Sequence, residues 1–164
     1  MKNAFTCSVS ENVLKVDFDD RWDHVRHYQS LFNATGEIAR SCLANKKWAL
    51  LINWRQQLIQ IPEEERICVR TVNRHVLLGL HTVVNVIDPH PITQWQLDKV
   101  ASSNPAINAQ IFEQTDEALA WLFEQGFDTK LKEVDFDINW LSPSEDFKRA
   151  LDQLGLDQER FIET

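Results

Sequence analysis

Ala109 to Leu122 reads AQIFEQTDEALAWL and predicts a short strand, a tight turn and then a helix. Thr115 is placed to cap the helix, and Asp116 and Glu117 follow where the helix dipole favours negative charge. The apolar residues Ala118, Leu119 and Leu122 recur at helical spacing and form the buried face. Gly126 is placed to end the helix. This closing unit predicts an α/β architecture. It identifies no reaction.

Upstream of this unit, one continuous apolar run is typical of a strand buried on both faces, and a later valine-rich run predicts a second buried strand. Trp48–Ile52 reads WALLI, and His81–Ile87 reads HTVVNVI. Between them, Ile61-Pro62 followed by three glutamates begins a helix that ends near Gly79. Ile92 to Ser102 predicts a further short amphipathic helix before the closing unit. Strands that alternate with helices in this way indicate a largely parallel sheet.

The first 44 residues predict a hairpin and a helix. Phe5–Val9 and Val13–Phe18 are β-prone runs around a polar turn. A helix from about Arg21 to Ala44 follows, and Thr35-Gly36 is a point where it is expected to break or bend. The complete order ββαβαβαβα predicts a five-stranded mixed sheet with about four helices over residues 1–127.

Composition excludes several classes of function. The net charge of −8 makes bulk attraction to nucleic acid or to an anionic membrane unfavourable. We expect no signal peptide and no membrane span, because no long apolar run is present. Cys7, Cys42 and Cys68 form no C-x-x-C pair, which favours reduced thiols and a cytoplasmic location.

Residues 128–164 differ in character from the rest and predict an acidic C-terminal extension. They hold ten acidic and five basic residues, so −5 of the net charge of −8 lies there. Ser142-Pro143-Ser144-Glu145 begins a capped helix, and Phe147, Leu151 and Leu154 follow at helical spacing. The alternating residues 134–138 predict an edge strand. Because a short helix needs a surface for its apolar stripe, we hypothesise that the extension docks on a second subunit and builds a homodimer.

Three of these stretches resemble STAS-like domains, the anti-sigma-factor-antagonist fold, in its SpoIIAA-like branch. The similar stretches are WALLIN from Trp48, HTVVNVI from His81, and QIF with DEALAWL near the end of the domain. The resemblance covers roughly residues 5 to 127. It implies a small regulatory or binding module with no cofactor that acts through protein contacts, without naming the partner. We expect no enzyme, because the sequence holds no G-x-S-x-G, P-loop or G-x-G-x-x-G motif.

Phosphorylatable members of that family carry a serine or threonine in the loop after the central strand. Here that loop, residues 53–60, reads NWRQQLIQ and holds no hydroxyl side chain. We therefore expect no phosphorylation switch in this loop.

The ends of the two buried strands carry the first candidate site. Trp54 and Arg55 follow one strand, and Asp88 and His90 follow the other. Ligands of open α/β sheets bind at the carboxyl ends of strands, and a ring beside a cation can hold a planar or acidic group. The alternative interpretation is structural: Trp54 covers the core, and Arg55 pairs with a glutamate of the next helix.

A basic stripe is the second candidate for a partner or ligand. Arg66, Arg70 and Arg74 recur at every fourth position and fall on one helix face. They can grip an acidic partner such as the extension, or form ordinary ion pairs with neighbouring glutamates. His24 and His27 have helical spacing, but no Cys or other His lies at a sequence spacing that indicates a third ligand, so no metal site is predicted.

Six tryptophans leave a second function open. Trp48 and Trp121 fall in core patterns, whereas Trp22 and Trp95 are candidates to border a pocket between helices. The leading prediction is a non-enzymatic interaction module. The alternative is a carrier or sensor of a small apolar or weakly acidic ligand.

Overall fold

The computed structural model describes residues 4–19, 22, 24–54, 62–89 and 91–134. Its strands are β1 (Phe5–Val9), β2 (Val13–Phe18), β3 (Trp48–Asn53), β4 (Leu80–Val86), β5 (Asn108–Phe112) and β6 (Lys132–Glu133). Its helices are α1 (His24–Ile38), α2 (Pro62–Leu77), α3 (Pro91–Ser102) and α4 (Thr115–Glu124), with a π-helical turn at Ala39–Leu43 after α1. The predicted α/β class and the four helices are confirmed.

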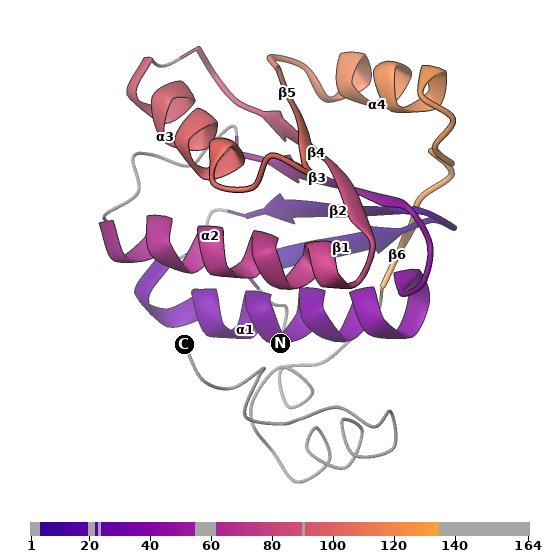
Figure 1. The fold of residues 1–164 in the computed structure, drawn as a ribbon, viewed down its shortest axis with the longest axis horizontal. Coiled ribbons are helices and arrows are strands. Elements are labelled where there is room, and N and C mark those ends of the chain that lie inside the picture. Colours follow the sequence, from indigo (N-terminus) through magenta and orange to yellow (C-terminus); the bar gives the residue numbers. More distant parts are fainter. Residues whose placement is uncertain (1–3, 20–21, 23, 55–61, 90, 135–164) are drawn as a thin grey trace, which may run out of the picture.

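The strands form one mixed sheet in the order β5-β4-β3-β2-β1-β6 (Figure 1). β1 and β2 pair antiparallel as the predicted hairpin, and β2, β3, β4 and β5 run parallel to one another. The prediction of five strands was short by one, because β6 adds an antiparallel edge strand beside β1. The carboxyl ends of the four parallel strands therefore meet at one edge of the sheet.

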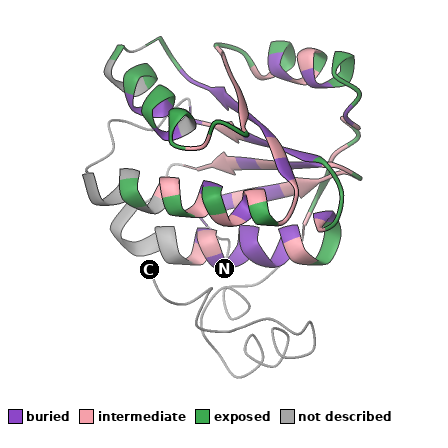
Figure 2. Ribbon diagram, viewed as in Figure 1, coloured by how far each residue is buried: buried purple, intermediate pink, exposed green. Residues whose placement is uncertain are grey.

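Helices cover the two faces of the sheet unequally. The core on one face lies under α1 and α2 and includes Leu50 and Val83, with Val72 from α2 and Val100 from α3. The core on the other face is smaller and joins Val84 to α4. Figure 2 shows the contrast, because α4 presents mostly exposed residues outward whereas α1 carries a broad buried side. A further core cluster joins Trp54, Ile87 and Leu97, so three clusters of described residues hold one sheet.

The first long helix does not break where the sequence suggested. α1 continues through Thr35 and Gly36 to Ile38. The Thr35 hydroxyl donates to the Leu31 carbonyl at 2.9 Å, a bond within the helix that satisfies the buried hydroxyl. The irregularity comes later, in the π-helical turn. The buried stripe of α1 against the sheet outweighs the low helix propensity of Thr-Gly.

α4 ends as predicted and begins differently. Gly126 has φ +91°, and the Phe127 amide donates to the Leu122 carbonyl at 3.0 Å, which is the pattern of a Schellman motif. At the start, Gln114 is the cap residue and makes no side-chain capping bond. The predicted cap at Thr115 was wrong by one position, since Thr115 is already helical.

The described start of the C-terminal extension packs on its own chain. The Asp128 amide donates to the Asn12 side chain at 2.7 Å, and the Ser10 hydroxyl donates to the Asp128 carbonyl at 2.6 Å. β6 then pairs with β1, and the Val134 amide donates to the Cys7 carbonyl at 2.8 Å. The predicted helix from Ser142 and its docking on a second subunit lie outside the described residues and stay predictions.

Candidate functional site

The structure describes two of the four residues predicted at the ends of the buried strands, Trp54 and Asp88. β3 and β4 are neighbouring parallel strands, and the Trp54 amide donates to the Val86 carbonyl at 2.7 Å, so the two loops do start side by side as expected. The Trp54 side chain is buried, whereas Asp88 is exposed. Arg55 and His90 lie outside the described residues. The structure therefore places Trp54 in the interior and Asp88 at the surface.

The basic stripe lies on α2 at the surface. Arg66 and Arg70 are exposed, and Arg74 is half-buried. None of the three lines the cavity that α2 helps to form on its other side. Their predicted role as a docking site for an acidic partner stays a prediction.

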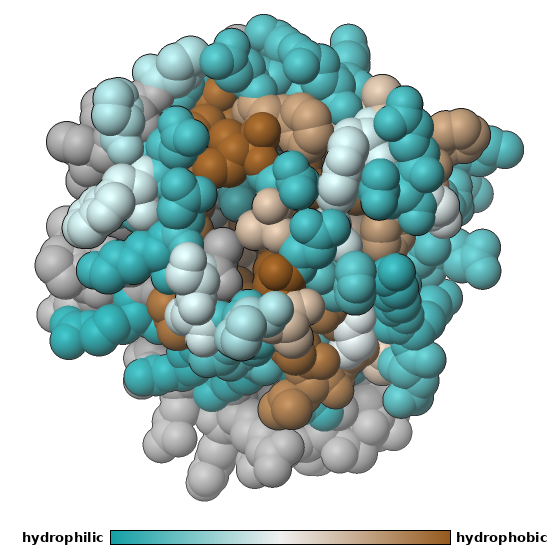
Figure 3. Space-filling model, turned by 45° about the horizontal axis from the view of Figure 1, so that its top comes forward, coloured by the Kyte–Doolittle hydropathy of each residue, from teal (hydrophilic) through white to brown (hydrophobic). Residues whose placement is uncertain are grey.

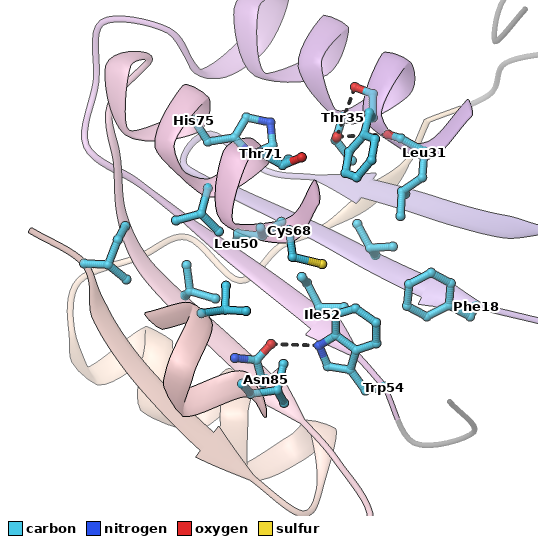
Figure 4. Close-up of a pocket in the computed structure, with 17 residues that line it drawn as sticks. Phe18, Leu31, Thr35, Leu50, Ile52, Trp54, Cys68, Thr71, His75 and Asn85 are labelled. Atoms are coloured by element: carbon cyan, nitrogen blue, oxygen red, sulfur yellow. Dashed lines mark hydrogen bonds between the residues drawn. The ribbon is translucent and has the colours of Figure 1, made fainter. Parts of the chain in front are cut away.

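An apolar cavity of about 80 Å³ lies between the sheet and helices α1, α2 and α3 (Figure 4). The sheet and its strand ends contribute Val16, Phe18, Leu50, Ile52, Trp54, Val83, Asn85 and Ile107. The helices contribute Leu31, Phe32, Thr35, Cys68, Thr71, Val72, His75, Leu97 and Val100. Within the described part of the chain, no Asp, Glu, Lys or Arg lines this cavity. A charged group would gain no partner there, whereas an apolar group would leave water.

Aromatic rings form the end of the cavity near the carboxyl ends of β2 and β3. The centroid of the Phe18 ring lies 5.3 Å from that of Trp54 and 4.5 Å from that of Trp22. The Trp54 indole donates to the Asn85 side-chain oxygen at 2.8 Å (Figure 4). This buried bond fixes the orientation of the indole ring, so Trp54 is a rigid wall of the cavity.

Polar side chains are few along the cavity, and most are already engaged. The Thr35 hydroxyl is bonded to Leu31, and Asn85 accepts from Trp54. Thr71 also has a partner. His75 differs: its Nδ1 is buried without a hydrogen-bond partner among the described residues. It is the one orphaned polar atom that the cavity lining contains in this part of the chain.

His75 lies on the α2 wall of the cavity, beside Thr71 (Figure 4). Its ring packs edge-on against Trp48 with centroids 5.5 Å apart. Burial, together with the smaller effect of the positive charge of Arg74, lowers the pKa of His75 from 6.5 to about 4. The imidazole is therefore neutral at physiological pH, with one nitrogen as donor and the other as acceptor.

The expectation that two tryptophans border a pocket between helices was wrong for the pocket found. Trp22 contacts Phe18 outside the lining, and Trp95 is 59% exposed on α3, with the Lys99 ammonium 5.0 Å from its ring centroid. The sequence pointed to Trp54 but missed His75. The available signal was its spacing: Cys68, Val72 and His75 follow at i, i+4 and i+7, which puts the histidine on the buried stripe of α2.

Comparison with known proteins finds no match among protein-family models, curated proteins or solved structures. The resemblance to STAS-like domains accordingly stays a prediction from the sequence. No described helix is long and apolar enough to cross a membrane.

Proposed function

We propose that this domain binds a small, neutral, largely apolar molecule in the cavity between the sheet and helices α1, α2 and α3. The observation that carries the proposal is the cavity itself, since native cores are close-packed and a void lined by aliphatic and aromatic side chains costs stability. Binding an apolar ligand restores the missing contacts and removes apolar surface of the ligand from water.

The ligand is neutral because the cavity offers a charged group no counter-charge. This narrows the class of ligand, because the carrier or sensor predicted from the sequence also allowed weakly acidic ligands. A carboxylate would need a cation or several donors, and the lining described here provides neither. A weak acid would enter only in its protonated form.

Surface features favour the cavity over a protein-docking role. Among the described residues, the exposed large apolar side chains are Leu77, Trp95 and Phe123, and each lies on a different helix. The face of the molecule in Figure 3 is mostly hydrophilic, with its apolar patches separated by polar side chains. Single exposed apolar residues are normal in soluble domains and mark no interface.

Cysteine labelling tests the proposal inside one molecule. Cys68 lines the cavity and Cys42 is exposed in the π-helical turn, so one thiol reports occupancy and the other serves as the control. Cys7 is buried, and burial raises the pKa of its thiol to about 12, which keeps it unreactive. Each thiol is followed separately by mass spectrometry of its peptide after reaction with a small methanethiosulfonate.

Furan, a five-membered apolar ring, is the probe. With furan at ten times its Kd, the unoccupied fraction falls roughly tenfold, and the labelling rate of Cys68 should fall by the same factor. The rate at Cys42 should not change. Val83→Phe fills the cavity and should abolish the furan effect. Labelling of Cys68 that is indifferent to furan at its solubility limit would refute the proposed function.

A further inference from the structure

The unpaired nitrogen of His75 indicates what kind of ligand the cavity accepts, an inference that rests on the proposed function. A buried polar atom left without a hydrogen bond costs roughly 1–3 kcal/mol, so native structures rarely keep one without a reason. His75 is 3% exposed, and among the described residues its Nδ1 has no hydrogen-bond partner, whereas Thr35, Thr71 and Asn85 of the same cavity have partners.

Water is a poor occupant of this position. A buried water needs two to four polar partners, and an apolar cavity that cannot supply them stays dry. The Thr35 hydroxyl hydrogen and the Asn85 side-chain oxygen are already bonded to Leu31 and Trp54, and Thr71 has a partner as well. A water at His75 would therefore compete for polar groups that are already engaged.

The ring of His75 is held in a fixed position. It is enclosed on α2, and the edge-on contact with Trp48 restrains it from the sheet side. The Trp48 indole is itself anchored, because its Nε1 donates to the Leu78 carbonyl at 3.1 Å. When the proton of the neutral ring is on Nε2, Nδ1 is a fixed acceptor, and it selects by chemistry as well as by size because a ligand donor bonds to it without any reorganisation of the site.

We infer that the neutral His75 ring carries its proton on Nε2, and that the ligand of this cavity is a small neutral molecule with an apolar body and a single N–H or O–H donor, which donates a hydrogen bond to Nδ1 of His75. The apolar body lies against Leu50, Val83 and Leu97, which line the same cavity. Small heteroaromatic amines and short alcohols or phenols have this chemistry.

Pyrrole and furan form a matched pair of probes for this inference. Both are neutral five-membered aromatic rings of similar size, and only pyrrole carries an N–H donor. Their affinities for the full chain are measured by chemical-shift titration. Pyrrole should bind about tenfold more tightly than furan, which corresponds to 1.4 kcal/mol for the added hydrogen bond. In His75→Phe, which keeps an aromatic ring at this position, the two affinities should become equal.

The resonance of Nδ1 provides a second measurement on the unchanged protein. With ¹⁵N-labelled histidine, pyrrole should shift the His75 Nδ1 signal, and furan should leave it close to its position in the free protein. This readout decides the question even if His75→Phe does not fold.

The outcomes separate the two proposals. Equal binding of pyrrole and furan to the natural chain, or a preference for furan, overturns the role of His75 while the cavity remains a ligand site. A pyrrole preference that persists in His75→Phe also overturns it. Binding of neither probe overturns both the role of His75 and the proposed function.

Discussion

Two neighbouring valines of β4 provide the sharpest test of where the empty space lies. Val83 lines the cavity, and Val84 points to the opposite face, where it is fully buried in the core beneath α4. Val83→Ile and Val84→Ile add the same methylene group to the same strand. Because isoleucine keeps the β-branch of valine, strand propensity changes little and equally at both positions.

The expected effects have opposite signs. Filling a cavity of about 80 Å³ at about 24 cal/mol per Å³ sets a ceiling of roughly 2 kcal/mol on what can be recovered. One buried methylene contributes roughly 0.8 kcal/mol of that. Val83→Ile should therefore raise the free energy of unfolding by up to about 1 kcal/mol. Val84→Ile forces an extra methylene into a filled core and should lower it by about 1–3 kcal/mol.

Urea denaturation of the natural chain and both variants measures these differences. The slopes of free energy against urea should agree among the three proteins, so that the midpoints alone report stability. A Val83→Ile variant that is destabilised as strongly as Val84→Ile would show that the space beside Val83 is already filled, and the reasoning from the cavity would fail.

Three further predictions use other described features. His75 is protonated near pH 6.5 in the unfolded chain but only near pH 4 in the folded state, so the free energy of unfolding should fall by on the order of 3 kcal/mol as the pH is lowered from 6.5 to 4. In urea titrations, His75→Phe should lack this part of the pH dependence. Gly126→Ala, at φ +91° in open space, should lower the free energy of unfolding by roughly 1–2 kcal/mol through backbone strain. Gly79→Ala should lower stability more in thermal unfolding, because its Cβ would lie 2.1 Å from the Lys46 carbonyl oxygen. Trp54→Phe leaves the Asn85 side-chain oxygen without its donor and should cost roughly 1–3 kcal/mol in urea, a loss that an unchanged midpoint would contradict.

Local patterns predicted the parallel part of the fold well. The run from Trp48 to Ile52 is wholly apolar and the run from His81 to Ile87 is rich in valine and isoleucine, which favours buried strands, and both form central strands. The closing unit carried its own stop signal in Gly126, whose positive φ the structure confirms.

Features that depend on contacts between distant parts of the chain could not be predicted from the sequence. Lys132 and Glu133 have no strand pattern, and they form β6 only because Ser8 and Val9 of β1 offer a free edge. The Thr35-Gly36 step reads as a helix break, yet packing of α1 against the sheet keeps it helical. In both cases tertiary context overrides local propensity.

The sequence predicted one residue of the candidate site, but it did not predict the cavity. Trp54 followed from its place at the end of a central strand. The cavity did not, because its walls come from separate strands and three helices, and no spacing in the chain encodes a void among them. His75 was readable from its position on the buried stripe of α2, but only the structure shows that its Nδ1 lacks a partner.

A crystal structure of the full chain soaked with pyrrole tests the account most directly. The account predicts one pyrrole ring in the cavity, against Leu50, Val83 and Leu97, with its nitrogen at hydrogen-bond distance of roughly 2.7–3.2 Å from Nδ1 of His75. A cavity that stays empty at saturating pyrrole, with the ring bound only elsewhere or not at all, would contradict it.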